Sequence, residues 1–138
     1  SHIMNNTLVD NRHGLGLFEM HDGAGGGTAT VVNSIIWDNG TNLEVRDDST
    51  ITVDYSHIQG GWPGASNFFD QAPLFRSAQN RNYRLQETSP CVDSGTSEGA
   101  PTLDVLGISR PHGKGIDRGA YEFFEFYSVY IPLVLDHP

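Results

Sequence analysis

Acidic side chains gather around an arginine in the last third of the chain, at a spacing that could serve acid–base chemistry. The acids are Asp104, Asp117 and Glu122, and Arg110 lies between them. Two carboxyl groups held apart by a suitable distance can cleave a glycosidic bond as general acid and base. The segment is rich in Gly and Pro, however, so its backbone groups need side-chain partners. We therefore favour a structural ion-pair network, with Arg110 buried and bonded to one of these acids.

Three further acids surround a predicted turn and could bind calcium. Asp47, Asp48 and Asp54 carry oxygen ligands of the type that Ca²⁺ takes in proteins. Neither an EF-hand nor an Asp-rich nonapeptide repeat accompanies them. Exposed carboxylates in turns are the commoner case, so we expect no cofactor, with Ca²⁺ kept as the alternative.

Two tryptophans could stack on a sugar ring. Trp62 stands between Gly61 and Pro63 in a predicted loop, and Trp37 ends a β-branched stretch. An aromatic ring offers a flat apolar face with a polar edge, which suits sugars. The alternative is that both rings pack into a core or anchor a loop.

The side chains that a polysaccharide lyase would need do not form a recognisable set. Lys114 is the only lysine, and it lies in a glycine-rich stretch. The histidines lack the spacing of zinc ligands, and no Gly-x-Ser-x-Gly or phosphate-binding loop occurs. Cys91 has the character of a small buried apolar residue. We therefore predict no catalytic residue in this chain.

Composition excludes several kinds of partner. The 138 residues carry a net charge of −9 and no basic stripe, so nucleic acid is not expected as a ligand. The apolar stretch 123–135 is shorter than the about 20 residues of a membrane helix, so no membrane span is predicted. We interpret that stretch as a β tail.

A repeated motif sets the architecture. The sequence Asn-Ser-Ile-Ile-Trp-Asp-Asn at 33–39 echoes residues 5–11, and a fainter echo follows at 55–61. The offsets of 28 and 22 residues are typical of a solenoid, in which each turn buries its apolar face on the next. Residues 31–37 and 50–56 should then be parallel neighbouring strands.

The aligned asparagines predict ladders between turns. Asn5 stands one turn from Asn33, and Asn11 stands one turn from Asn39. Stacked amides can hydrogen-bond from one turn to the next. A row of sugar-binding amides is the alternative.

The chain divides into four parts on this interpretation. Ser1 and His2 look like the remnant of a cleaved tag. The other parts are parallel β-helix turns at 3–61, a looped C-terminal cap at 62–122, and the β tail at 123–138. The predicted fold class is all-β: two to three turns of right-handed parallel β-helix followed by the cap.

These motifs together resemble a known family. The helix motifs at 33–39 and 55–61 are followed by Gln-Ala-Pro-Leu-Phe at 71–75, Tyr-Arg-Leu at 83–85, Ser-Pro-Cys-Val-Asp-Ser-Gly at 89–95 and Asp-Arg-Gly-Ala-Tyr-Glu at 117–122. The combination is similar to the "choice-of-anchor" C-terminal module of pectin-lyase-like proteins. One difference is that Gln71 stands where the family usually has an acid. The resemblance implies a β-helix in a bacterial protein that is secreted or on the cell surface.

Two functions remain open. The first is a non-catalytic structural and interaction module that ends an extracellular β-helix, with carbohydrate as its ligand. The alternative is the C-terminal fragment of a polysaccharide lyase or glycoside hydrolase whose catalytic residues lie in upstream turns. An uncovered first turn would also expose strand edges, so we expect self-association through the N-terminal end or through the apolar tail.

Overall fold

The computed structural model describes residues 1–68 and 70–125, and within them it shows strands but no α-helix. No helix in this described part could cross a lipid bilayer. A short 3-10 helix spans Ala78–Asn80. The strands are β1 (His2–Met4), β2 (Thr7–Val9), β3 (His13–Leu17), β4 (Thr28–Val32), β5 (Ile35–Trp37), β6 (Thr41–Val45), β7 (Thr50–Asp54), β8 (His57–Ile58), β9 (Phe75–Ser77) and β10 (Asn82–Leu85).

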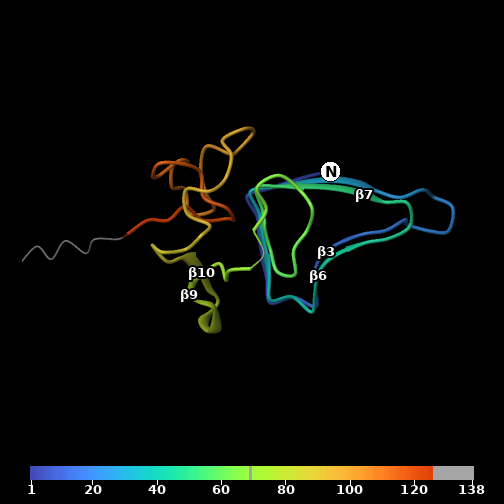
Figure 1. The fold of residues 1–138 in the computed structure, drawn as a ribbon, viewed down its shortest axis with the longest axis horizontal. Coiled ribbons are helices and arrows are strands. Elements are labelled where there is room, and N and C mark those ends of the chain that lie inside the picture. Colours follow the sequence, from blue (N-terminus) through green and yellow to red (C-terminus); the bar gives the residue numbers. More distant parts are fainter. Residues whose placement is uncertain (69, 126–138) are drawn as a thin grey trace, which may run out of the picture.

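The first eight strands form three parallel sheets that the chain visits in the same order on each circuit. The sheets are β1-β4-β7, β2-β5-β8 and β3-β6. Thr7 pairs with Ile35, an offset of 28, and Val31 pairs with Val53, an offset of 22. Figure 1 shows these circuits superposed. The prediction of an all-β chain with parallel strands at these offsets is confirmed.

The expected strand at 31–37 is interrupted by a corner at Asn33. Its φ is 51°, and Asn5 and Tyr55 at the aligned positions have φ of 51° and 50°. A second corner recurs at Asp10 and Asp38, with φ of 60° and 50°. Asn and Asp tolerate this left-handed region better than most residues because their short polar side chains bond locally. The recurrence of Asn and Asp in the motif therefore marks corners and not strand centres.

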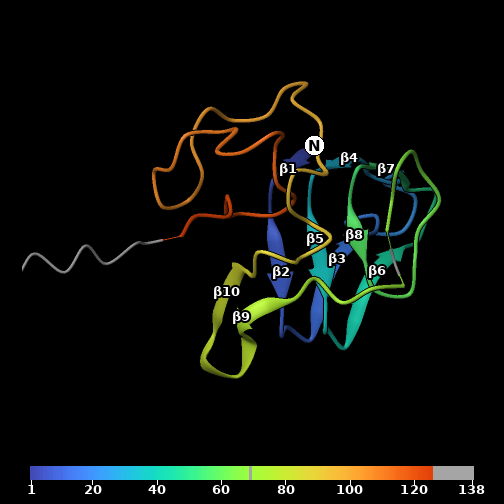
Figure 2. The ribbon, with the colours of Figure 1, turned by 60° about the vertical axis from the view of Figure 1, so that its left-hand side comes forward.

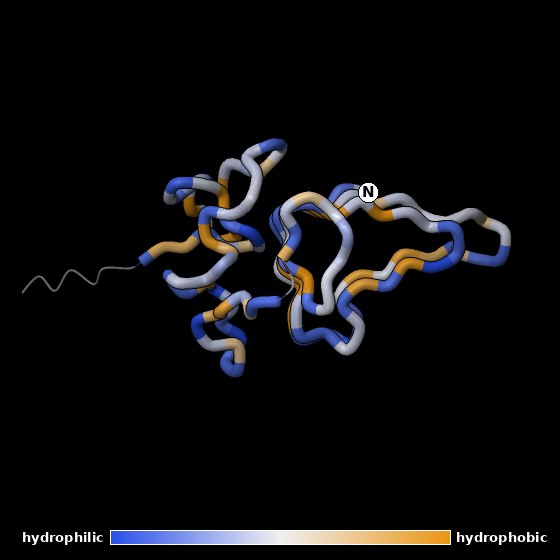
Figure 3. The backbone as a smooth tube through the Cα atoms, viewed as in Figure 1, coloured by the Kyte–Doolittle hydropathy of each residue, from blue (hydrophilic) through white to orange (hydrophobic). Residues whose placement is uncertain are grey.

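Apolar side chains fill the space between the sheets. Val31, Ile36, Val53 and Ile58 form the buried cluster. Figure 3 shows hydrophobic residues along the strands and hydrophilic residues at the far tips of the circuits.

The loop 60–68, here called the end loop, closes one end of this core. Trp62 packs against the buried cluster. Tyr55 N–H donates to Ala65 O at 2.8 Å, and Ile58 N–H donates to Phe68 O at 2.9 Å, so the loop continues past β7 and β8. The end of the stack is therefore covered by fewer than ten residues of chain and one indole ring.

Residues 70–125, here called the cover segment, lie beside the stack and not over its end. They pack on the outer face of the β2-β5-β8 sheet, as Figures 1 and 2 show. Ile35 and Trp37 on that face join Leu85 and Cys91 in a second apolar cluster. The predicted cap at 62–122 is thus two structures: an end loop and a lateral cover.

The cover segment holds one pair of strands that the sequence did not predict. β9 and β10 run antiparallel, with Asn82 opposite Ser77 and Leu85 opposite Phe75. Residues 103 and 109 add an isolated antiparallel bridge. The predicted β tail lies mostly outside the described residues, and its described part, 123–125, has no strand.

Asn33 should be sensitive to loss of its side chain. Its amide bonds Asn5 and Thr96, so Asn33→Gly leaves buried partners unpaired and should cost about 2–4 kcal/mol of unfolding free energy. Asn33→Ala should cost about 1 kcal/mol more, because alanine is strained at this φ. Urea unfolding measures both. Equal stability of the two variants and the parent would refute the role assigned to this corner.

Candidate functional site

The predicted cap network centres on one buried ion pair. Arg110 Nη1 lies 2.6 Å from Glu122 Oε1, and both side chains are 1 % exposed. Arg110 also donates to the carbonyls of Asp117 at 3.2 Å and Gly119 at 3.0 Å. The guanidinium therefore ties together the loop in which its carboxylate partner lies.

The other two acids do not pair with Arg110. Asp104 Oδ1 accepts the N–H groups of Leu106 and Ile108, each at 2.8 Å. Its Oδ2 accepts Glu122 N–H at 2.9 Å. Asp117 accepts Asp93 N–H at 2.7 Å through Oδ1 and Phe123 N–H through Oδ2. These carboxylates take the place of secondary structure by binding backbone donors.

Every oxygen of these two carboxylates accepts at least one backbone N–H. Burial raises the pKa of Asp117 to about 6, and its bonds to backbone N–H oppose that shift. The cavity beside Asp117 has a volume of about 40 Å³, and the one beside Glu122 about 10 Å³. Ligand pockets usually measure about 300 Å³ or more. Both cavities beside the network are smaller than this.

Arg118 fastens the cover segment to the sheet. It is 1 % exposed, and its Nη1 donates to Ser56 O at 3.0 Å. Its Nε and Nη2 donate to Ser94 O at 3.1 and 2.9 Å. The guanidinium lies 4.1 Å from the Phe68 ring centroid, within cation–π range. Burial lowers the pKa of Arg118 to about 10, which leaves it charged at neutral pH.

His57 lies fully buried in the same interface, although no motif in the sequence pointed to it. Its ring is 5.2 Å from Trp37 and 6.0 Å from Phe68, centroid to centroid. Nε2 bonds Gln71 O, so this nitrogen carries the proton and Nδ1 is left without a partner. Burial lowers the pKa of His57 below 6.5.

The two asparagine pairs bond from one circuit to the next. Asn33 Nδ2 donates to Asn5 Oδ1 at 3.3 Å, and Asn11 Nδ2 donates to Asn39 Oδ1 at 3.1 Å. Asn5 and Asn33 face the cover segment, where Asn33 exchanges two bonds with Thr96. The buried amides of Asn5 and Asn33 are not accessible to a sugar, whereas the pair of Asn11 and Asn39 lies nearer the surface.

The remaining candidates do not assemble into a site. Trp62 packs on the core and Trp37 on the second cluster, so packing is the better interpretation of both rings. Asp47, Asp48 and Asp54 belong to no group of three or more potential metal ligands, and the described residues hold no such group. Burial raises the pKa of the Cys91 thiol to about 12, which keeps it protonated.

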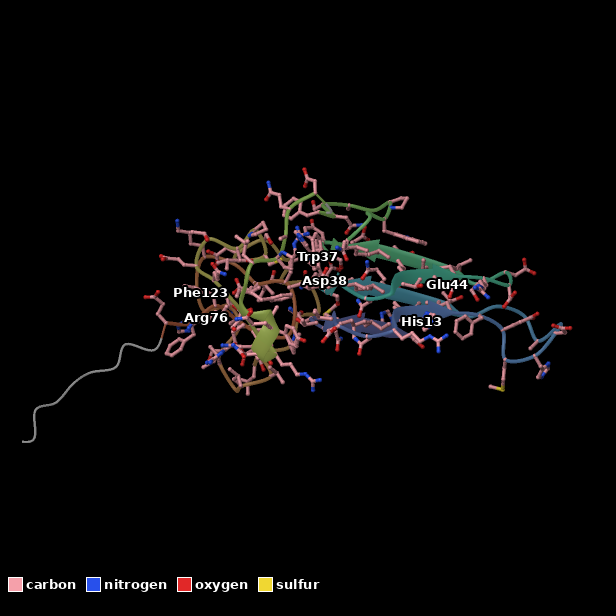
Figure 4. All side chains as sticks on the ribbon, turned by 90° about the horizontal axis from the view of Figure 1, so that it is seen from below. His13, Trp37, Asp38, Glu44, Arg76 and Phe123 are labelled. Atoms are coloured by element: carbon pink, nitrogen blue, oxygen red, sulfur yellow. The ribbon has the colours of Figure 1, made fainter. Side chains whose placement is uncertain are left out.

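A groove that the sequence did not indicate lies on the outer face of β3 and β6. Its volume is about 350 Å³, and it is lined by His13, Gly16, Phe18, Glu44 and Arg46. Phe18 is 56 % exposed and its ring lies over Gly16, where a Cβ atom would come within 2.7 Å of the ring. Glu44 and Arg46 form an ion pair. Figure 4 shows His13 and Glu44 on these neighbouring strands.

We compared the chain with family models, curated proteins and solved structures. None of the three comparisons found a match. The geometry of the molecule therefore carries the functional argument.

Removal of Arg110 should destabilise the cover segment strongly. Arg110→Ala leaves Glu122 as an unpaired buried charge, which costs about 3–5 kcal/mol. Arg46→Ala is the matched control, because it removes an ion pair with Glu44 in which the arginine side chain is 65 % exposed. Loss of this exposed pair should lower the unfolding free energy by less than about 1 kcal/mol. Thermal and urea unfolding test both. Equal losses in the two variants would show that burial of the Arg110 pair contributes nothing.

His57 should make the protein sensitive to acid. Because its folded pKa is below the unfolded value of 6.5, stability is lost as the pH falls below 6.5. Asp117 acts in the opposite direction, since a folded pKa raised from 3.8 to about 6 removes stability as the pH rises between these values. The comparison is therefore between the parent and His57→Phe at each pH from 7.5 to 5. We expect the variant to lose less unfolding free energy than the parent as the pH falls from 7.5 to 5. Parallel curves of unfolding free energy against pH for the two proteins would refute this.

Proposed function

We propose that this chain is a non-catalytic structural and interaction module that ends a right-handed parallel β-helix in a secreted or cell-surface bacterial protein. The observation that carries the proposal is the use of Asp104, Asp117 and Glu122. Their oxygens bind backbone N–H groups and one arginine inside the cover segment. Groups engaged in this way hold loops together and are not available for acid–base chemistry.

The parallel sheets support the β-helix part of the proposal. β1 to β5 each pair with the strand one circuit later, at offsets of 28 and 22 residues. Crossovers between parallel strands are right-handed in nearly all proteins, which favours that hand here. The resemblance in sequence motifs points to the same family of folds.

The end loop supports the terminating role. Trp62 covers the apolar core where the third circuit finishes. Capping elements of this kind are needed at the ends of repeat proteins, because an open end exposes the core. The cover segment then secures the circuits from the side.

Carbohydrate binding is a second candidate role, and the groove on β3 and β6 favours it. An exposed aromatic ring beside a carboxylate and a guanidinium combines a stacking surface with hydrogen-bonding groups for hydroxyls. The alternative of a lyase or hydrolase fragment would place its catalytic residues outside this chain.

One assay separates these functions. The protein is mixed with insoluble and soluble polysaccharides, including uronate polymers, and both retention and new reducing ends or double bonds are measured. We expect no bond cleavage. If the groove binds sugars, Phe18→Ala should reduce retention at least tenfold, whereas Leu103→Ala, at an exposed apolar residue of the cover segment, should not. Cleavage products from the parent protein would overturn the non-catalytic assignment.

A further inference from the structure

Within residues 1–68 and 70–125, nothing equivalent to the end loop covers the opposite end of the stack. β1, β2 and β3 are the outermost strands of their sheets, and each has a single strand neighbour among the described residues. A cavity of about 300 Å³ opens there between the sheets, lined mainly by apolar residues that include Ile3, Leu15, Leu17 and Ala29. Strand edges and an apolar interior are thus presented together.

A row of side-chain hydrogen bonds follows the first corner and links each circuit to the next. Ser34 Oγ accepts Asn6 N–H from the preceding circuit at 3.2 Å, and donates back to Val32 O at 3.0 Å. Ser56 repeats this pattern, accepting Ser34 N–H at 3.1 Å and donating back to Asp54 O at 3.0 Å. Each side chain bonds its own backbone two residues earlier and offers an oxygen to the circuit before it.

Asn6 repeats the first half of this pattern. Its Nδ2 donates to Met4 O at 2.9 Å, again two residues earlier. By position, its Oδ1 corresponds to the Ser34 and Ser56 hydroxyl oxygens. The circuit that would supply a donor to this oxygen is absent from the described chain.

Asn11 repeats a second ladder at the other end of β2. Asn39 Oδ1 accepts Asn11 N–H at 3.0 Å, while Asn39 Nδ2 donates to Trp37 O at 3.1 Å. Asn11 Nδ2 likewise donates to Val9 O at 3.1 Å. Two acceptors therefore flank β2 in the positions that Ser34 and Asn39 hold around β5.

We propose that this N-terminal edge is a docking surface for one further coil of polypeptide, parallel to β1, β2 and β3. Two of its backbone N–H groups would donate to Asn6 Oδ1 and Asn11 Oδ1. The proposal rests on the proposed function, since it identifies the polypeptide that a module at the end of a β-helix would bind. We favour this occupant over the self-association expected at this end, because both ladders bond parallel neighbours.

The register of β1 shows how a further coil can be joined to the chain for a test. His2 pairs with Thr30, so Ser1 aligns with Ala29, which the chain reaches from Thr28. The Ser1 ammonium lies 2.8 Å from Thr28 O at this place. A segment joined to Ser1 in the way that Thr28 is joined to Ala29 would complete a circuit of 28 residues.

The test extends the full chain by a second copy of residues 1–28 placed directly before Ser1. Each residue of the copy then aligns with its counterpart in β1, β2 or β3. We expect the urea m-value to rise by about one fifth, in proportion to the added chain. In hydrogen exchange, the copy's amides at positions 6 and 11 should exchange at least tenfold more slowly than in a peptide of the same sequence.

The matched control is a 27-residue copy that lacks the copied Leu8, which lies inside β2 between positions 6 and 11. Circuits of 28 and 22 residues both stack here, so a loss in a connection would be tolerated, whereas a loss inside β2 prevents positions 6 and 11 from both being in register. This copy should not protect both amides. In the 28-residue extension, Asn6→Ala at the original position should remove protection at copied position 6 but not at 11, and Asn11→Ala should do the reverse. An unprotected 28-residue copy would overturn the proposal. The polysaccharide assay would be unaffected, so the two failures are distinguishable.

Discussion

Asn33 joins the stacked strands to the segment that covers them, and most of the architecture depends on this connection. Its side chain bonds Asn5 in the circuit before it and Thr96 in the cover segment, while its carbonyl accepts Gly119 N–H at 2.6 Å. Glycine is required around it. A Cβ atom at Gly95 would lie 2.8 Å from Asn33 Oδ1, and one at Gly119 would lie 2.6 Å from Thr7 Oγ1.

Charged side chains provide the hydrogen-bond partners for much of the backbone of the cover segment. It has one short strand pair, so most of its N–H and carbonyl groups find partners outside a sheet. Carboxylates accept the N–H groups, and Arg110 and Arg118 donate to the carbonyls. The acids of this segment therefore have a structural explanation that does not require a substrate.

The sequence predicted the circuits well because each circuit repeats the same local requirements. Asn33 and Asp38 mark corners, and Ile36 marks the core, at positions that recur with the period of the stack. The strand limits were less predictable, since the left-handed φ of Tyr55 ends β7 two residues earlier than its β-branched pattern suggested. A tyrosine carries no turn signal of its own.

Contacts between distant segments were the least predictable. Arg110 was expected to bind one of three acids, but no local pattern selects Glu122 over Asp104 or Asp117. Arg118 reaches Ser56 across 62 positions, and no local pattern encodes that distance. His57 and the groove under Phe18 likewise arise only when separate circuits come together.

The lateral position of the cover segment has a mechanical consequence. Repeat stacks usually lose their end units one at a time, because each unit contacts only its neighbours. Here the cover segment bonds the first circuit through Asn5 and Thr7, the second through Asn33, and the third through Ser56. A pulling force on the first circuit is therefore shared with the third, and the short stack resists peeling from its ends as a single cooperative body.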